Sequence, residues 1–180
     1  MGLLMELDGF DGRVAFVSGG ARGIGAEIAG RLSALGAKVA VGDIVEGGTR
    51  DILHVQLDVS SEASVAEGVG QVADELGPPT ILVLNAGIFP IEPLEDMTLA
   101  SWQKTIDVNL TGNFLLARRV LPFMRNDGYG RLVSLGSSAG VTGGSGDKAA
   151  YAASKAGLMA LTKAIASDYA KFGVVANTLA

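Results

Sequence analysis

Tyr151 and Lys155 are the two residues of this sequence best suited to move a proton together. They stand four positions apart in a segment with helical periodicity, so both side chains project from one helix face. An ammonium close to a phenol favours the phenolate and lowers the pKa of the phenol from about 10, as general acid-base catalysis requires. Most Tyr-x-x-x-Lys pairs arise by chance, so neighbouring residues must supply the context. The same face continues inward through Leu158, Thr162 and Ile165.

Three further polar residues are expected near this pair. Asn109 lies on an otherwise apolar helix face and needs a hydrogen-bond partner; the alternative to a catalytic role is a core amide that braces the helix. Ser137 and Ser138 follow a predicted strand at its carboxyl end, where open α/β sheets bind ligands. Their alternative role is that of hydroxyl groups capping a loop.

Gly19, Gly23 and Gly25 form a turn between the first predicted strand and the first predicted helix. Such a turn lets backbone amides meet a pyrophosphate at the helix N-terminus, where the helix dipole favours negative charge. The turn differs from the G-x-G-x-x-G pattern because Ile28 occupies the last glycine position. A glycine-rich bend without a ligand is the alternative.

Asp43 closes the second predicted strand 18 residues after Gly25, near the offset of about 20 expected for a ribose-binding acid. A carboxylate there accepts hydrogen bonds from ribose hydroxyls and repels a 2′-phosphate, which favours NAD over NADP. Arg22, on the glycine turn, has the opposite effect because it could pair with that phosphate. The alternative for Asp43 is an ordinary solvated acid at the end of a strand, and the alternative for Arg22 is a surface charge.

Composition narrows the chemistry further. The 180 residues hold 14 Lys and Arg against 19 Asp and Glu, a net charge of −5, which favours a small-molecule ligand over nucleic acid or an anionic membrane. The chain has no cysteine and one histidine, His54, so thiolate catalysis and paired-histidine metal motifs are excluded, and we expect no metal site. No apolar run is long enough for a membrane span and residues 1–10 lack a basic leader, which predicts a cytoplasmic protein.

Strands and helices alternate along the chain. Strands are predicted at 13–18, 38–43, 54–59, 80–84, 131–135 and 174–178, and helices at 23–36, 61–76, 102–124 and 149–172. This order predicts one α/β domain over residues 1–180, with a doubly wound parallel sheet covered on both faces. The glycine-rich stretch 140–146 is predicted to be a mobile loop.

Two places disturb this pattern. Only nine residues, 44–52, separate the second and third strands, whereas a parallel crossover takes about a dozen or more. The helix expected there is missing or vestigial. The sequence also stops at Ala180, directly after a strand, and we expect residues to be missing at both places.

In this order the motifs resemble those of the short-chain dehydrogenase/reductase family, from about residue 10 to residue 180. The matching elements are Gly19-x-x-x-Gly23-x-Gly25, Asp58-Val59, Asn85-Ala86-Gly87, Asn109, the serine after the fifth strand and Tyr151-x-x-x-Lys155. The resemblance implies a Rossmann-like fold. Family members usually run to about 250 residues, with a Pro-Gly turn, a substrate-covering segment and a seventh strand after the position of Ala180.

The resemblance also implies roles for individual residues. Tyr151 would be the proton donor or acceptor, and Ser137 would hydrogen-bond the substrate oxygen. Lys155 would bind the nicotinamide ribose and lower the tyrosine pKa, while Asn109 would hold a water in a proton relay. The implied cofactor-binding residues are Gly19, Arg22, Gly23, Ile24, Gly25, Asp43, Asp58, Val59, Asn85, Ala86, Gly87, Tyr151 and Lys155.

The choice of serine rests on two spacings that disagree. In the family pattern a glycine usually follows the catalytic serine by three positions, and Gly140 then selects Ser137. The serine also usually stands thirteen positions before the tyrosine, which selects Ser138. One inserted residue in the glycine-rich loop reconciles them, and we favour Ser137. Ser18 stands where the family more often has threonine, which keeps the hydroxyl.

The sequence therefore predicts an oxidoreductase that transfers hydride between NAD(H) and a carbonyl or secondary alcohol, with NADP the less favoured cofactor. Two alternatives stay open, namely a dinucleotide-binding sensor or scaffold without turnover and a dehydratase or epimerase of the same fold. The resemblance implies a homodimer or homotetramer built through the two long helices.

Overall fold

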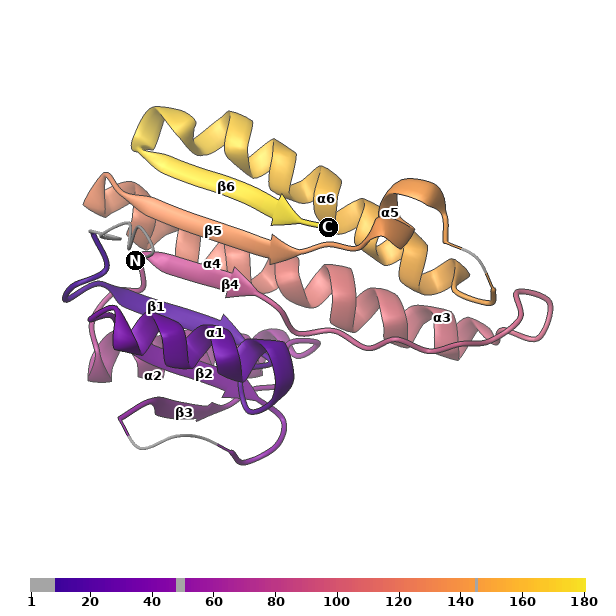
Figure 1. Ribbon diagram of the computed structural model, residues 1–180, viewed down its shortest axis with the longest axis horizontal. Helices are drawn as coiled ribbons and strands as arrows, with labels where there is room; N and C mark the ends of the chain where they lie inside the picture. The colour runs from indigo at the N-terminus through magenta and orange to yellow at the C-terminus, as the bar shows by residue number, and fades with distance from the viewer. Residues whose placement is uncertain (1–8, 48–50, 145) are drawn as a thin grey trace, which may run out of the picture.

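Six short apolar segments form one parallel sheet in the computed structural model, which describes residues 9–47, 51–144 and 146–180 (Figure 1). The strands are β1 Val14–Ser18, β2 Lys38–Asp43, β3 Leu53–Gln56, β4 Ile81–Leu84, β5 Gly130–Leu135 and β6 Val174–Leu179. Their order is β3-β2-β1-β4-β5-β6, with every neighbouring pair parallel. The chain thus winds outward from β1 in one direction and from β4 in the other, which confirms the predicted doubly wound fold.

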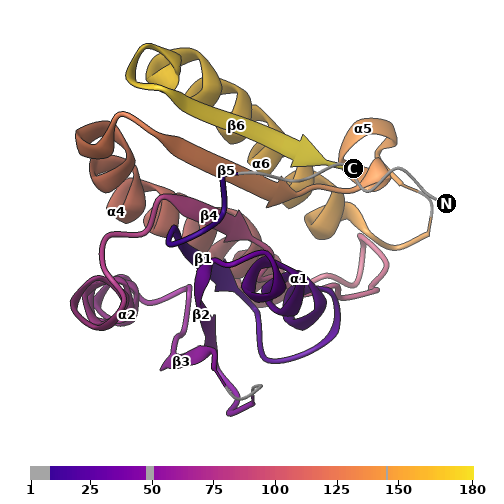
Figure 2. The same cartoon turned by 60° about the vertical axis from the view of Figure 1, so that its left-hand side comes forward.

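Helices cover both faces of this sheet. They are α1 Gly23–Ala34, α2 Glu62–Glu75, α3 Leu99–Ile106, α4 Gly112–Asp127, α5 Ser138–Thr142 and α6 Ala149–Tyr169. Figures 1 and 2 show α1 on one face and α2, α4 and α6 on the other. Helix starts follow local sequence: Ser61 and Thr98 accept hydrogen bonds from the backbone amides of Ser64 and Ser101 at the N-termini of α2 and α3.

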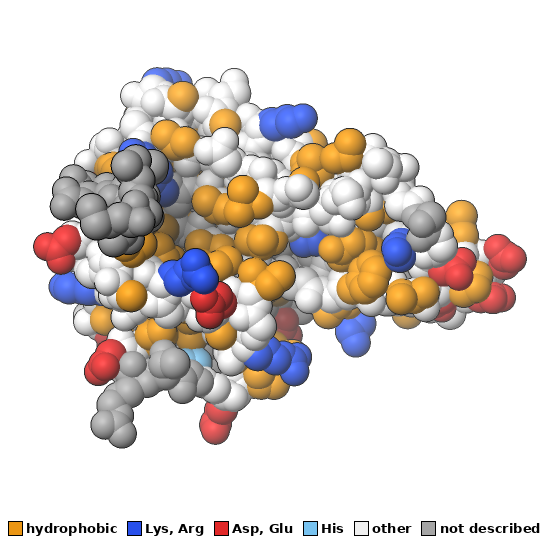
Figure 3. Space-filling model, in the orientation of Figure 1, with side chains coloured by type: hydrophobic (Ala, Val, Ile, Leu, Met, Phe, Trp, Pro, Cys, Tyr) orange, Lys and Arg blue, Asp and Glu red, His pale blue; other side chains and the backbone are white. Residues whose placement is uncertain are grey.

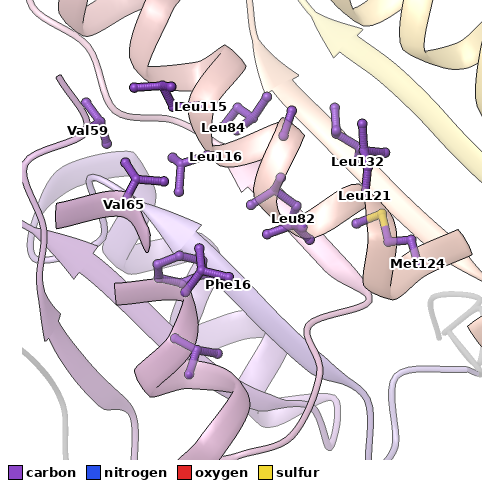
Figure 4. Packing of buried hydrophobic residues seen from close by; sticks show 14 of the residues in the cluster. Phe16, Val59, Val65, Leu82, Leu84, Leu115, Leu116, Leu121, Met124 and Leu132 are labelled. Carbon is purple, nitrogen blue, oxygen red and sulfur yellow. The ribbon is translucent and has the colours of Figure 1, made fainter. Parts of the chain in front are cut away.

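The two sheet faces carry separate apolar cores, which explains why the strands are apolar at nearly every position. On the larger side, Phe16 and Leu82 are fully buried against helix residues such as Leu116 and Met124 (Figure 4). On the α1 side, a smaller core surrounds Val41. Only α1 covers that side among the described helices, and the apolar side chains Val175 and Leu179 of β6 are exposed. Figure 3 shows apolar side chains on this face of the molecule.

The predicted helix 102–124 is helical throughout, but it is not one regular α-helix. The segment begins at Leu99, three residues earlier than predicted, and a π-helical turn, Asp107–Thr111, separates α3 from α4. A π turn adds a residue to the helical repeat and shifts every later side chain around the axis. Asn109, in the π turn, and Leu116, in α4, are each fully buried.

Two loop predictions have different outcomes. The connection after β2 contains no helix in its described residues 44–47 and 51–52, although β2 and β3 pair in parallel. In contrast, residues 138–142 form α5, so the prediction of a mobile loop from residue 140 is wrong at its start. The Ser137 hydroxyl accepts from the Ala139 amide and begins this short helix, and Gly143, at φ +81°, ends it.

Candidate active site

Two cavities open at the carboxyl edge of the sheet. The larger has a volume of about 800 Å³ and lies beyond the ends of β1, β2 and β4. The smaller, of about 320 Å³, lies between α5, the start of α6 and the segment after β4. The larger cavity is lined by Gly19, Arg22, Ile24, Gly42, Asp43, Ile44, Leu57, Asp58, Val59, Ser60, Asn85, Ala86, Gly87, Ile88, Ala100, Gln103, Lys104, Asp107 and Val108. The smaller is lined by Phe89, Ser137, Ser138, Ala139, Thr142, Gly144, Lys148 and Tyr151.

The glycine turn brings bare backbone to the larger cavity. Gly19 and Gly23 have φ angles of +64° and +58°, which side-chain-bearing residues rarely adopt. A Cβ atom at Gly25 would lie 2.2 Å from the carbonyl oxygen of Gly19. The turn therefore needs glycine at these positions, and it directs the N-terminus of α1 to the cavity, an arrangement suited to an anionic group.

Ser18 and Asn85 fix this turn to the segment after β4. The Ser18 hydroxyl accepts from the backbone amides of Asn85 and Ala86, at 3.1 Å each. The Asn85 side chain donates to the carbonyl oxygens of Ser18 and Gly19, at 2.9 and 2.8 Å. Ser18 is fully buried, and the asparagine amide is engaged within the protein, so both residues shape the cavity by holding its walls.

Asp43 stands at the end of β2, across the glycine turn. Its carboxylate accepts from the backbone amide of Ala21 at 3.1 Å and from that of Val45 at 3.3 Å. Arg22 lines the same cavity, so both charges predicted from the sequence lie at this site. Ile24 and Ile44, 66% and 63% exposed, also line it and offer apolar contacts to a ligand.

Asp58 and Val59 line the cavity beside Asp43, because β3 pairs with β2. One Asp58 carboxylate oxygen accepts from the backbone amide and the hydroxyl of Ser60, at 2.9 and 2.6 Å. Val59 is buried against Gly112, where a Cβ atom would lie 2.8 Å from the Val59 carbonyl oxygen. This close approach joins the start of α4 to the cavity wall.

The predicted pair on α6 shares one face, as expected. The Lys155 Nζ atom lies 5.7 Å from the centroid of the Tyr151 ring and donates to the carbonyl oxygen of Leu135 at 2.5 Å. Lys155 is 5% exposed, and burial lowers its pKa from the ordinary value of 10.5. Further along the face, Leu158, Thr162 and Ile165 are buried, which confirms that it points inward.

Asn109 is fully buried in the π turn and its side chain is satisfied. Its Oδ1 atom accepts from the Ile88 amide at 2.7 Å, and its Nδ2 atom donates to the Ile88 carbonyl oxygen at 2.9 Å and to the Ser154 hydroxyl at 3.1 Å. Between Asn109 and Lys155 lies Gly87, where a Cβ atom would be 3.2 Å from Asn109 Oδ1 and 3.7 Å from Lys155 Nζ. The asparagine thus braces the segment beside the lysine.

Ser154 is a functional candidate that sequence reasoning missed. It is fully buried, accepts from Asn109 Nδ2 and donates to the carbonyl oxygen of Tyr151 at 2.7 Å. One hydroxyl therefore connects the π turn to the backbone of the catalytic candidate. The sequence shows only that a serine directly precedes Lys155. It does not show that this serine bonds Asn109, which lies 45 residues away.

The smaller cavity brings Ser137 and Tyr151 together. Ser137, which is half-buried, and Ser138, which is exposed, both line this cavity, so the choice of Ser137 stays a prediction. The Phe89 ring meets that of Tyr151 edge to face, with centroids 4.5 Å apart. Lys148, also missed from the sequence, has its Nζ atom 5.5 Å from the Phe89 ring centroid.

The predicted site residues thus fall into three groups. Lining the larger cavity are Gly19, Arg22, Ile24, Asp43, Asp58, Val59, Asn85, Ala86 and Gly87. Ser137 and Tyr151 line the smaller one. The third group lines neither cavity and consists of Gly23, Gly25, Asn109 and Lys155. Within the described ranges, no cluster of three metal-ligating side chains occurs, and no helix is long and apolar enough to cross a membrane.

Comparison with known proteins decides the family. The family model described as short chain dehydrogenase matches residues 13–180. The chain belongs to the short-chain dehydrogenase family. It is 41% identical to a 2-dehydro-3-deoxy-L-rhamnonate dehydrogenase (NAD(+)) from Sphingomonas sp. (strain SKA58), over 94% of this chain and 71% of that protein.

Other relatives of this short-chain dehydrogenase differ in the substrate that their names give. A 3-oxoacyl-[acyl-carrier-protein] reductase, MabA, from Mycobacterium bovis is 39% identical over 95% of this chain and 69% of its own. The crystal structure of gox2181 superimposes with a TM-score of 0.90 at 34% identity, covering 94% of this chain and 71% of that one. Fold and family are therefore established together.

Proposed function

We propose that this short-chain dehydrogenase transfers hydride between NAD(H) and a carbonyl or secondary alcohol carbon. The observation that carries the proposal is the buried Lys155 ammonium, 5.7 Å from the ring of Tyr151, whose side chain lines a cavity together with Ser137. Family membership supports the reaction class. The cytoplasmic location and the homodimer or homotetramer expected from the sequence stay predictions.

The larger cavity fits a nicotinamide dinucleotide. Its glycine turn would hold the pyrophosphate and Asp43 would hold the adenine ribose, with Asp58 and Val59 beside the base. The segment Asn85–Gly87 would run along the ligand toward Lys155, which would hold the second ribose. When bound, the nicotinamide supplies or accepts the hydride.

Tyr151 moves the proton in the proposed reaction. In the direction of reduction, its hydroxyl donates a proton to the carbonyl oxygen, which also accepts a hydrogen bond from Ser137. In oxidation the phenolate takes the proton back, and the Lys155 ammonium stabilises that negative charge. Asn109 keeps the neighbouring wall in place through Ile88, and a water that relays protons would bind beside it.

The test follows the absorbance of reduced nicotinamide while the protein is mixed with NAD(H) and a panel of ketones and secondary alcohols. We expect exchange with at least one substrate. Tight cofactor binding without exchange on any substrate would favour a sensor or scaffold. Product formation without net change in the reduced cofactor would favour a dehydratase or epimerase.

Asp43→Asn is expected to reduce the preference for NAD over NADP by about tenfold. Asparagine keeps an oxygen for the Ala21 amide, but the charge that repels a 2′-phosphate is removed. The measurement is the ratio of dissociation constants for the two cofactors, by calorimetry. Asp58→Asn, in the same cavity, is the matched control and should change that ratio less. A wild-type preference for NADP would contradict the assignment of Asp43.

Ser154→Ala is expected to lower turnover about tenfold without changing cofactor affinity. The variant loses the hydroxyl that links Asn109 to the backbone of Tyr151, so the phenol is positioned less well. The free energy of unfolding should fall by about 1 kcal/mol. Ser134→Ala is the control, since its buried hydroxyl bonds Thr162 and Thr178 and does not contact Tyr151. Equal effects of the two variants on turnover would make Ser154 a purely structural residue.

A further inference from the structure

The smaller cavity holds a charged side chain beside its reactive hydroxyls. Among the described residues that line it, Lys148 alone carries a charge at neutral pH, while Ser137 and Tyr151 supply the hydroxyl groups. The cavity volume, about 320 Å³, suits a small substrate. Lys148 and Tyr151 thus line one small cavity, so one small molecule could reach both side chains.

Lys148 is held in place without being neutralised. It directly precedes α6, its Nζ atom lies 5.5 Å from the Phe89 ring centroid, and its side chain is half-buried. None of the three ion pairs and none of the side-chain hydrogen bonds in the described part of the chain involves it. The nearby Glu92 carboxylate accepts instead from the Ser101 hydroxyl at 2.6 Å.

The position of Lys148 also fixes its reach. It stands three residues before Tyr151, a rise of about 4.5 Å along a helix, so both side chains enter the cavity from the same end of α6. The chain carries a net charge of −5, which repels anions at a distance, so an anionic substrate needs a local cation at the site. The N-terminus of the 21-residue α6 adds to that positive potential.

We infer that the substrate is a short hydroxy or oxo acid, and that Lys148 binds its carboxylate while Tyr151 and Ser137 act on the hydroxyl or carbonyl a few bonds away. This inference rests on the proposed function, because Tyr151 defines where the reacting carbon lies. Phe89 forms the apolar wall between the two ends of the substrate.

The experiment compares wild-type protein with Lys148→Gln, Lys148→Arg and Lys163→Gln, the last an exposed lysine on α6 outside both cavities. Levulinate binding to the NAD-saturated protein is measured by calorimetry. Hydride transfer from NADH is measured with levulinate and with its uncharged methyl ester, each of which would be reduced to the alcohol. We expect Lys148→Gln to weaken levulinate binding at least about tenfold, with NAD affinity and any activity on the ester unchanged. Lys148→Arg should restore most of the levulinate affinity, and Lys163→Gln should have no effect.

Failure of this inference can be told apart from failure of the proposed function. No levulinate binding, or binding equally tight in Lys148→Gln, would overturn the inference even if the protein reduces neutral ketones. Levulinate binding that depends on Lys148 supports it, even where levulinate itself is not turned over. Absence of hydride exchange with every substrate, in contrast, would count against the oxidoreductase proposal.

Discussion

Tyr151→Phe is expected to slow hydride transfer by about a thousandfold while leaving the fold and the dinucleotide affinity unchanged. The substitution removes one oxygen atom, the proposed proton donor, and general acid-base catalysis contributes between about 10² and 10⁴ to enzymatic rates. The phenylalanine ring keeps the edge-to-face contact with Phe89, whose centroid lies 4.5 Å away. The decrease in rate therefore measures the loss of proton transfer by Tyr151 and not a change in packing.

The rate is best measured in a single turnover, because product release then does not mask the chemical step. Tyr169→Phe is the matched control, since Tyr169 lies on the same helix, packs against Phe172 and lines neither cavity. Calorimetry with NAD gives the affinity of each variant. Undiminished transfer in Tyr151→Phe would exclude this tyrosine as the acid and base.

The parallel sheet could be predicted from the sequence because strands that are buried on both faces are apolar at nearly every position. All four residues of β4 are buried, and each is apolar. The π turn at 107–111 could not be predicted from the apolar spacing, because one extra residue looks like a small error in helical phase. The side chain of Asn109, within the π turn, bonds the backbone of Ile88, 21 positions away in the sequence.

Some residues of the candidate site could likewise be predicted from the sequence, and others could not. Gly19 and Gly25 could be predicted because the backbone geometry of the turn excludes side chains at those positions. Ser154 and Lys148 could not, since a lone serine and a lone lysine carry no pattern of their own. Their importance comes from neighbours distant in the sequence, Asn109 for Ser154 and Phe89 for Lys148.

Lys155→Met is expected to abolish most of the activity and yet to raise the melting temperature by a few degrees at neutral pH. Activity should fall at least about a hundredfold, because the charge that stabilises the Tyr151 phenolate is gone. Stability responds to two opposing effects. The variant loses the hydrogen bond to the Leu135 carbonyl, worth about 1.5 to 3 kcal/mol for a charged donor, but it also escapes the burial of an ammonium, which costs several kcal/mol.

The pH dependence separates these two effects. Burial lowers the Lys155 pKa in the folded protein below its ordinary value of 10.5, so between the lowered pKa and 10.5 the unfolded state binds more protons. Wild-type stability should therefore gain from rising pH in that range, and the methionine variant should lack this gain. The stability advantage of Lys155→Met is then largest below the lowered pKa and shrinks toward pH 10.5.

Thermal unfolding of both proteins across this pH range gives the measurement, with the exposed Lys163→Met on the same helix as control. A melting temperature that drops in Lys155→Met at neutral pH would mean that the Leu135 bond outweighs the cost of burying the charge. Parallel pH curves for the variant and wild type would mean that this lysine keeps its ordinary pKa. Either result would contradict the interpretation that the buried Lys155 charge destabilises the fold and is retained for catalysis, because stability alone would then explain why this lysine is buried.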